Sequence, residues 1–172
     1  MKKSVSTVVV LLLALLGMTA ASPALARSKA PLGYQLMCLQ SPAECKGGGK
    51  ATVKATENVM TTLKRVNHRI NSTMKPRRDS GADIWDAKAS AYGDCEDFVL
   101  AKRRELIAAG LPANALRIAY VKTRAGVGHA ILVVNTGKGK FVLDNLTNSI
   151  KPLSQAGYRV VSMQGANPGN WS

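Results

Sequence analysis

Long apolar runs, internal repeats and aromatic residues are all scarce in this sequence of 172 residues. Residues 8–16 form its one long apolar run, so the chain is not a polytopic membrane protein, which needs several spans of about 20 apolar residues. No Gly-X-Y period, heptad array or repeat of about 20–50 residues occurs, which excludes fibrous and solenoid architectures. Apolar residues still make up 46% of the chain, too many for a disordered protein. The length then predicts one compact domain.

Acidic residues are also few, since 10 Asp and Glu stand against 24 Lys and Arg, a formal net charge of +14. The basic residues are densest at 75–78 and at 102–104. Such runs are usually solvated faces, and attraction to an acidic substrate or to anionic envelope polymers is the functional alternative. With aromatic residues at 5% there is little to stack on bases, so we expect no nucleic-acid partner.

The N-terminus has the three parts of a secretory signal peptide. Lys2 and Lys3 give a positive start, residues 8–16 an apolar stretch, and Ala24 and Ala26 a small-residue cleavage site. The sequence therefore predicts that residues 1–26 are a cleaved signal peptide. Residues 27–172 are then a single exported domain, located in a bacterial periplasm without stable membrane insertion. An uncleaved anchor is the alternative, although the apolar stretch is short for a membrane span.

Export determines how the three cysteines are interpreted. Cys38 and Cys45 frame a short polar turn, and in an oxidising compartment cysteines this close in sequence tend to form a disulfide. A zinc site is disfavoured because no His lies near them and their spacing is wide for zinc ligands. Cys95 has no obvious partner, so it is either a buried inert thiol or a reactive one.

Hydrophobic periodicity predicts two helices in the first two thirds of the chain. Residues 27–50, which contain the cysteine pair, are expected to be irregular. A helix is expected over 51–72, followed by a polar loop over 75–86 and a second helix over 94–109. The apolar stripe of the first helix is Val59, Leu63, Val66 and Ile70.

After residue 110 the spacing of apolar residues changes from the helical period to the two-residue period of β-strands. Strands are expected over 116–123, 129–136, 140–145 and 158–163. The predicted fold class is therefore α+β, with N-terminal helices packed on an antiparallel β-sheet.

Cys95 lies at the expected start of the second helix, directly after the N-cap residue Asp94. Unpaired backbone N–H groups and the helix dipole stabilise a thiolate at such a position. A nucleophilic thiol also needs a base. Of the two histidines, His68 falls on the polar side of the first helix, whereas His129 opens a strand where its ring can project from the sheet edge.

The turn at Gly137 and Lys138 decides which residue His129 meets. A two-residue turn pairs Ile131 with Asp144 and makes Asp144 the diagonal neighbour of His129 on the same face. A three-residue loop would put Asp144 on the opposite face. The turn chemistry favours the shorter loop and therefore a His–Asp pair. From spacing alone, an ordinary edge histidine beside a strand-ending Asp144 is an equally good interpretation.

Several segments together resemble the bacterial transglutaminase-like cysteine peptidases. The three most specific are GDCED at 93–97, GHA at 128–130 and VLDNL at 142–146. Further similarity lies at 66–67, at 83–85 and in the Cys38/Cys45 pair, so the resemblance covers nearly all of the chain after the signal peptide. It implies the papain-like (transglutaminase-like) fold, in which a helix presents the Cys and an antiparallel sheet presents the His and the Asp.

The same resemblance implies the roles of three residues. Cys95 would be the nucleophile, His129 the general base and then general acid, and Asp144 the residue that fixes the imidazole tautomer. The implied activity is cleavage of a peptide bond through a thioacyl-enzyme. The best-understood relatives are periplasmic proteases that cut a surface adhesin to release biofilm cells, so a surface or envelope protein is the expected substrate. Acyl transfer to an amine and a non-catalytic binding protein that keeps the fold stay open as alternatives.

Asp94, Glu96 and Asp97 surround Cys95 with carboxylates. Helix capping explains Asp94 and Asp97, but negative charge raises the pKa of a neighbouring thiol. A Ca²⁺ site made by these three acids is the other interpretation, because hard cations take several carboxylate oxygens and would offset the repulsion. Adhesin-cleaving relatives depend on calcium through acids beside the catalytic Cys, which these residues resemble. No organic cofactor is expected, and Trp85 is expected either to line the cleft or to belong to the core.

Overall fold

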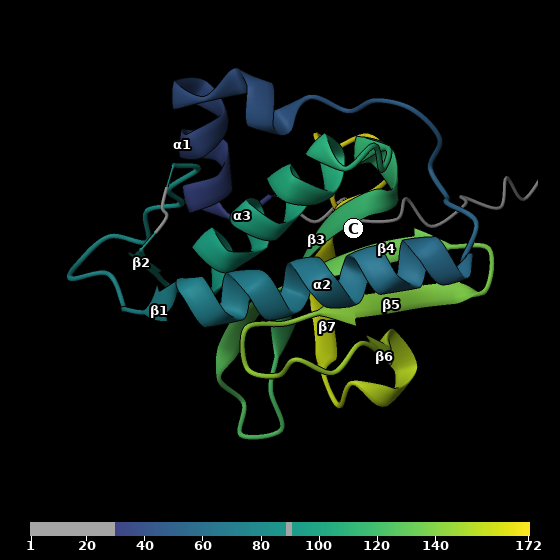
Figure 1. The fold of residues 1–172 in the computed structure, drawn as a ribbon. Helices are drawn as coiled ribbons and strands as arrows, with labels where there is room; N and C mark the ends of the chain where they lie inside the picture. Colours follow the sequence, from purple (N-terminus) through teal and green to yellow (C-terminus); the bar gives the residue numbers. More distant parts are fainter. Residues whose placement is uncertain (1–29, 89–90) are drawn as a thin grey trace, which may run out of the picture.

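The structure, a computed structural model, describes residues 30–88 and 91–172 (Figure 1). The predicted signal peptide lies outside the described residues. In the described part, no helix combines the length and the apolar character needed to cross a bilayer. The helices are α1 (Leu32–Gln40), α2 (Glu57–Thr73) and α3 (Cys95–Ala108), with short 3-10 helices η1 (Pro42–Cys45), η2 (Ala113–Ala115) and η3 (Leu153–Gln155).

Five strands form the main sheet, in the spatial order β6-β5-β4-β3-β7, and every neighbouring pair is antiparallel. They are β3 (Leu116–Lys122), β4 (Gly128–Thr136), β5 (Gly139–Leu143), β6 (Lys151–Pro152) and β7 (Arg159–Met163). A separate parallel pair joins β1 (Lys75–Pro76) to β2 (Tyr92–Gly93). The predicted α+β class, with helices followed by an antiparallel sheet, is confirmed.

The hairpin between β4 and β5 has the predicted two-residue turn. Thr136 pairs with Gly139, and the same register continues to Leu132 opposite Leu143. Gly139 has a φ of 120°, a conformation that L side chains rarely adopt, so glycine suits the end of this turn. Because strand residues alternate between faces, this register fixes the face on which each later side chain lies.

Both faces of the sheet are covered. Helices α2 and α3 lie over one face (Figure 1), where Leu63 and Phe98 pack with Leu132 in the larger core. On the other face Ile131 belongs to a smaller core that Tyr158, among other residues, helps to cover. The strands are apolar on both sides for this reason.

Helix α2 begins later than its apolar pattern predicts. Thr56 caps it, because its Oγ1 accepts a hydrogen bond from the Val59 N–H at 3.3 Å. The preceding Val53 instead forms a parallel bridge to Thr136 of β4. The predicted apolar stripe is confirmed, since Leu63, Val66 and Ile70 are buried.

The prediction that residues 27–50 are irregular was wrong. Helix α1 forms there because tertiary contacts hold it, although its sequence has no strong helix signal. Tyr34 packs edge-on against Trp85 and Trp171, with ring centroids 5.5 Å and 5.2 Å away. The predicted disulfide between Cys38 and Cys45 is confirmed and closes the turn between α1 and η1.

The basic run at 102–104 is not a solvated face, because Lys102 and Arg103 are buried. The Arg103 guanidinium donates to the backbone carbonyls of Glu44 at 2.9 Å and of Lys46 at 3.4 Å, so it ties α3 to the disulfide-closed turn. The Lys102 Nζ has no hydrogen-bond partner among the described residues and lies 5.7 Å from the centroid of the Phe98 ring. Burial lowers the pKa of Lys102 to about 7, and the nearby Asp144 opposes that shift.

Replacing Lys102 by Met should therefore stabilise the protein, and the gain should depend on pH. The pKa of Lys102 is lower in the folded protein than in the unfolded chain. Below about pH 7 the folded protein therefore buries a charged ammonium, which lowers its stability. This destabilisation disappears as pH rises toward the pKa of the lysine in the unfolded chain. We expect Lys102→Met to raise the free energy of unfolding by roughly 1–3 kcal/mol at pH 6 and by less at pH 9. Urea unfolding at both pH values measures this. The exposed Lys64→Met is the control, and an equal gain at both pH values would contradict the account.

Candidate active site

Cys95 is the first residue of α3, as predicted, and the start of this helix is held tightly. Asp94 and Asp97 form the predicted capping box, with the Asp97 carboxylate 3.3 Å from the Asp94 backbone N. A second oxygen of Asp97 accepts a hydrogen bond from the Asp86 N–H at 2.7 Å. A side chain on Gly93 would meet the Asp97 Cβ at 2.6 Å, so only glycine allows this approach. The thiol is thus presented from a rigid helix terminus.

His129 and Asp144 are brought together by the β4–β5 hairpin. His129 is the second residue of β4, and Asp144 directly follows the last residue of β5. The His129 Nε2 and the Asp144 Oδ1 lie 2.9 Å apart, and both side chains are buried. An ionised carboxylate can only accept, so Nε2 carries the proton and Nδ1 is left as the acceptor. The pair that the sequence register predicts is therefore present.

Asp144 has further hydrogen-bond donors. Its Oδ2 accepts from the hydroxyl of Tyr158, and its Oδ1 also accepts from the Leu146 N–H at 3.1 Å. Burial alone would raise the pKa of Asp144, but the hydrogen bonds from His129, Tyr158 and Leu146 bring it below its ordinary value. Burial and the Asp144 carboxylate raise the pKa of Tyr158, which keeps the phenol protonated as a donor. The carboxylate is therefore ionised and fixed in orientation.

Cys95 and His129 line the same two cavities, one on each side of them. One cavity of about 490 Å³ is walled by Pro31, Trp85, Tyr120 and Val161, and we name it the apolar arm. The other, of about 640 Å³, is walled by Pro76, Arg77 and Arg78 together with Thr123 and Leu146, and we name it the basic arm. The two arms form a cleft that passes the thiol and the imidazole. Trp85 is both buried and part of the cleft wall.

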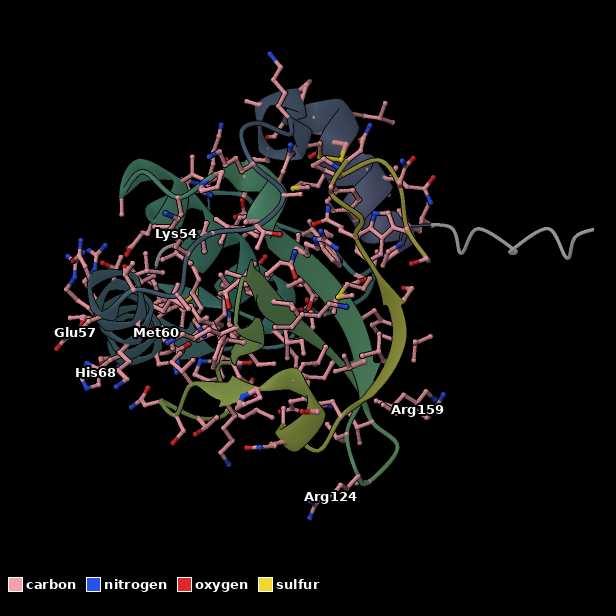
Figure 2. The ribbon with its side chains drawn as sticks, turned by 90° about the vertical axis from the view of Figure 1, so that its right-hand side faces the viewer. Lys54, Glu57, Met60, His68, Arg124 and Arg159 are labelled. Carbon is pink, nitrogen blue, oxygen red and sulfur yellow. A yellow bond between two sulfur atoms is a disulfide. The ribbon has the colours of Figure 1, made fainter. Side chains whose placement is uncertain are left out.

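His68 is remote from this cleft. It is exposed, and Figure 2 shows it on the outer side of α2, pointing away from the sheet. Its predicted place on the polar side of this helix is confirmed.

A cluster of acids lies beside Cys95, and its membership differs from the predicted one. Ligand atoms of Asp83, Asp94 and Glu96 all lie within 4.8 Å of one another. Asp97 does not join them, because its two oxygens are taken up by backbone N–H groups of Asp86 and Asp94. Asp83 takes its place from the loop before α3. The Asp94 Oδ1 is buried and has no hydrogen-bond partner among the described residues.

This cluster opposes ionisation of the thiol. The Cys95 Sγ donates to the Glu96 Oε2 at 2.9 Å. Burial, and then the Glu96 carboxyl group, raise the pKa of Cys95, while the Ala130 N–H lowers it. Burial also raises the pKa of Glu96 to about 9, with further contributions from Asp83 and Asp94. Positive charge in the cluster would reverse both effects.

Comparison with known proteins identifies the family of the chain. Residues 24–172 match the family described as bacterial transglutaminase-like cysteine proteinase (BTLCP). The chain belongs to this family. It is a transglutaminase-like cysteine peptidase, and its fold is the transglutaminase-like one. The chain matches none of the curated proteins compared with it.

Solved structures of LapG from Legionella pneumophila are similar to this BTLCP chain at 27% sequence identity. A calcium-bound LapG superposes with a TM-score of 0.56 over 66% of this chain and 68% of LapG. An EGTA-treated LapG superposes with a TM-score of 0.56 over 64% of each chain. A third LapG structure gives 0.57 over 66% of each chain. The similarity thus spans about two thirds of either protein.

Two residues of this site were not singled out for it from the sequence. Asp83 belongs to a family-like segment, but nothing in its spacing from Asp94 shows that the loop returns to the start of α3. The pattern around Tyr158 predicts only a strand. Its contact with Asp144 depends on how the segment between β5 and β7 crosses the sheet, and no local pattern encodes that path.

Replacing Tyr158 by Phe removes one donor to Asp144 and leaves a buried carboxylate oxygen without a partner. We expect the BTLCP domain to lose roughly 1–3 kcal/mol of unfolding free energy near pH 7. The pKa of Asp144 is lower in the folded protein than in the unfolded chain, so its ionised form stabilises the fold at pH values above the unfolded-chain pKa. The loss of unfolding free energy in Tyr158→Phe should therefore shrink as pH falls below about 4. Urea unfolding across pH checks this against Tyr92→Phe, which removes an exposed phenol hydroxyl and should change little. A pH-independent loss in Tyr158→Phe would argue against a role through Asp144.

Proposed function

We propose that this BTLCP peptidase cuts peptide bonds with a Cys95–His129–Asp144 triad. The observation that carries the proposal is the buried His129–Asp144 hydrogen bond at the cleft that Cys95 lines. Each residue type has the chemistry its role needs: a nucleophilic sulfur, a base with a ring nitrogen free to accept a proton, and a carboxylate that orients the base.

The first half-reaction forms the thioacyl-enzyme. The Cys95 thiol gives its proton to the His129 Nδ1, and the sulfur attacks the carbonyl carbon of the scissile peptide. The C–S bond forms, the C–N bond breaks, and the imidazolium returns the proton to the leaving amine. Asp144 holds the Nε2–H throughout, so the imidazole keeps the tautomer whose Nδ1 can accept.

The second half-reaction releases the acyl group. His129 Nδ1 takes a proton from water, and the hydroxide attacks the thioester carbonyl. The C–S bond then breaks, and the sulfur recovers the proton from the imidazolium. The products are the new carboxyl terminus and the free enzyme.

The substrate proposed is a protein of the cell envelope or surface, met after export. The Cys38–Cys45 disulfide supports export, because such bonds persist in oxidising compartments. The open cleft supports a protein substrate, because it runs past the thiol on both sides and suits an extended segment. The similarity to LapG covers only part of each chain, so a specific substrate is not transferred from it.

Thiol reactivity tests the triad. With Ca²⁺ present to offset the acidic cluster, iodoacetamide should alkylate Cys95 near neutral pH faster than it alkylates a free thiol, and His129→Ala should slow this by about 100-fold. His68→Ala is the matched control and should leave the rate unchanged. The assay is run with and without Ca²⁺, and mass spectrometry locates the label. An ordinary rate that is indifferent to His129→Ala would favour a non-catalytic binding protein.

A calcium ion is proposed at Asp83, Asp94 and Glu96. The residues fit such an ion, because three carboxylates converge within 4.8 Å and one buried oxygen of Asp94 has no partner among the described residues. Asp83 is exposed, which gives the ion a path from solvent. Bound Ca²⁺ supplies positive charge that favours ionised carboxylates and an ionised thiol. The calcium-bound LapG gives independent support for a calcium site in a similar protein.

Calorimetry tests the calcium site without any assay of activity. Titrating Ca²⁺ into the protein should give saturable heat, and Asp83→Asn should weaken binding by about tenfold or more, because a charged ligand becomes neutral. Asp79→Asn is the control, since its carboxylate lies nearby but outside the cluster. Absence of heat in the unaltered protein, or equal affinities for Asp83→Asn and Asp79→Asn, would remove the assignment.

A further inference from the structure

The basic run at 75–78 belongs to the cleft, unlike the run at 102–104. Strand β1 pairs with β2, and the Arg77 N–H donates to the Gly93 carbonyl at 2.8 Å. Gly93 lies two residues before Cys95, so the run is anchored beside the start of α3. Arg77 and Arg78 are consequently part of the wall of the basic arm, in the same cavity as Cys95 and His129.

The two arginines are available to a ligand. Both are exposed, and neither forms a salt bridge within residues 30–88 and 91–172. The Arg77 guanidinium lies 4.8 Å from the centroid of the Tyr92 ring, which restricts its orientation without neutralising its charge. Arg77 and Arg78 are the basic residues in the wall of the basic arm, and Figure 2 shows Arg159 projecting from the side of the molecule away from α2. The cleft therefore holds a local pair of unpaired guanidinium groups.

The two arms differ in chemistry. The apolar arm presents Trp85, Tyr120 and Val161, with Asp83 and Glu96 of the acidic cluster also in its wall and, among the described residues, no basic side chain but His129. The basic arm presents Arg77 and Arg78. An extended segment that passes Cys95 must place residues on one side of the scissile bond in the first arm and residues on the other side in the second. A guanidinium recognises a carboxylate by paired hydrogen bonds and charge, and it does not recognise an apolar side chain in this way.

We infer that the basic arm is a subsite for a carboxylate side chain of the substrate. The peptidase then selects segments that carry an Asp or Glu within a few residues of the scissile bond on the side of Arg77 and Arg78, and an apolar residue on the other side. The inference rests on the proposed function, because it takes Cys95 as the atom that attacks the substrate.

The acids near Cys95 do not cancel this subsite. Asp94 and Glu96 also line the basic arm, but they gather with Asp83 at the start of α3 and form no ion pair with either arginine in the described structure. The Asp79 carboxylate, next to Arg78 in sequence, accepts from the Ile84 N–H at 2.7 Å. Within the described residues, the two arginines thus have no ion-pair partner in the wall of this arm.

Two isosteric reagents test the subsite through the rate of Cys95 alkylation. N-iodoacetyl-aspartic acid amide carries a carboxylate, and N-iodoacetyl-asparagine amide carries a neutral group of the same shape. The measured quantity is the ratio of the alkylation rate with the anionic reagent to the rate with the neutral reagent. With Ca²⁺ present, this ratio should be higher for the unaltered protein than for free glutathione. The double variant Arg77→Gln/Arg78→Gln should lower this ratio by about fivefold, the effect of one lost charge contact in water, and Arg77→Glu/Arg78→Glu should invert the preference.

Lys64→Gln/Arg65→Gln is the matched control, because it removes the same net charge from the exposed face of α2, and its ratio should equal that of the unaltered protein. Added salt should reduce the preference in the unaltered protein. Equal ratios in the unaltered protein and in Arg77→Gln/Arg78→Gln would overturn the subsite. Failure of the proposed function has a different signature: both reagents would react slowly, and His129→Ala would change neither rate.

Discussion

The site depends on the register of one β-hairpin. The two-residue turn between β4 and β5 fixes Leu132 opposite Leu143, and this pairing directs the next residue, Asp144, to the face that carries His129. One additional residue in the turn would exchange the faces and separate the two side chains. Tyr158 then secures the carboxylate from the segment that covers the same face. A local feature of four residues thus determines the geometry of a buried hydrogen-bonded pair.

The start of α3 combines two opposing electrostatic demands. A capping box and a helix dipole favour negative charge at that end, and the sequence supplies Asp94, Glu96 and Asp97 there. The same charge disfavours the thiolate of Cys95. The structure divides the acids between two tasks: Asp97 holds the backbone, while Asp94 and Glu96 join Asp83 in a group whose charge is not balanced by the protein. The calcium ion proposed for that group would satisfy both demands.

The sequence predicted the features that follow from local patterns. The capping residues of α3, the apolar stripe of α2 and the turn of the β4–β5 hairpin are all short-range signals, and each was confirmed. Features that depend on long-range contacts were missed. Helix α1 is held by Tyr34 against aromatic rings from distant parts of the chain. Lys102 follows the charge pattern of a surface but lies on the buried side of its helix.

Arg103 links the disulfide-closed turn to the helix that begins with the free thiol of Cys95. Its guanidinium binds the carbonyls on either side of Cys45, so the oxidised Cys38–Cys45 turn braces the helix whose first residue is the reduced Cys95. A reductant such as dithiothreitol, added to a buffer to protect the free thiol, would also attack the bond that supports it. The buffer therefore needs a redox potential at which the Cys38–Cys45 disulfide stays oxidised while the Cys95 thiol stays reduced.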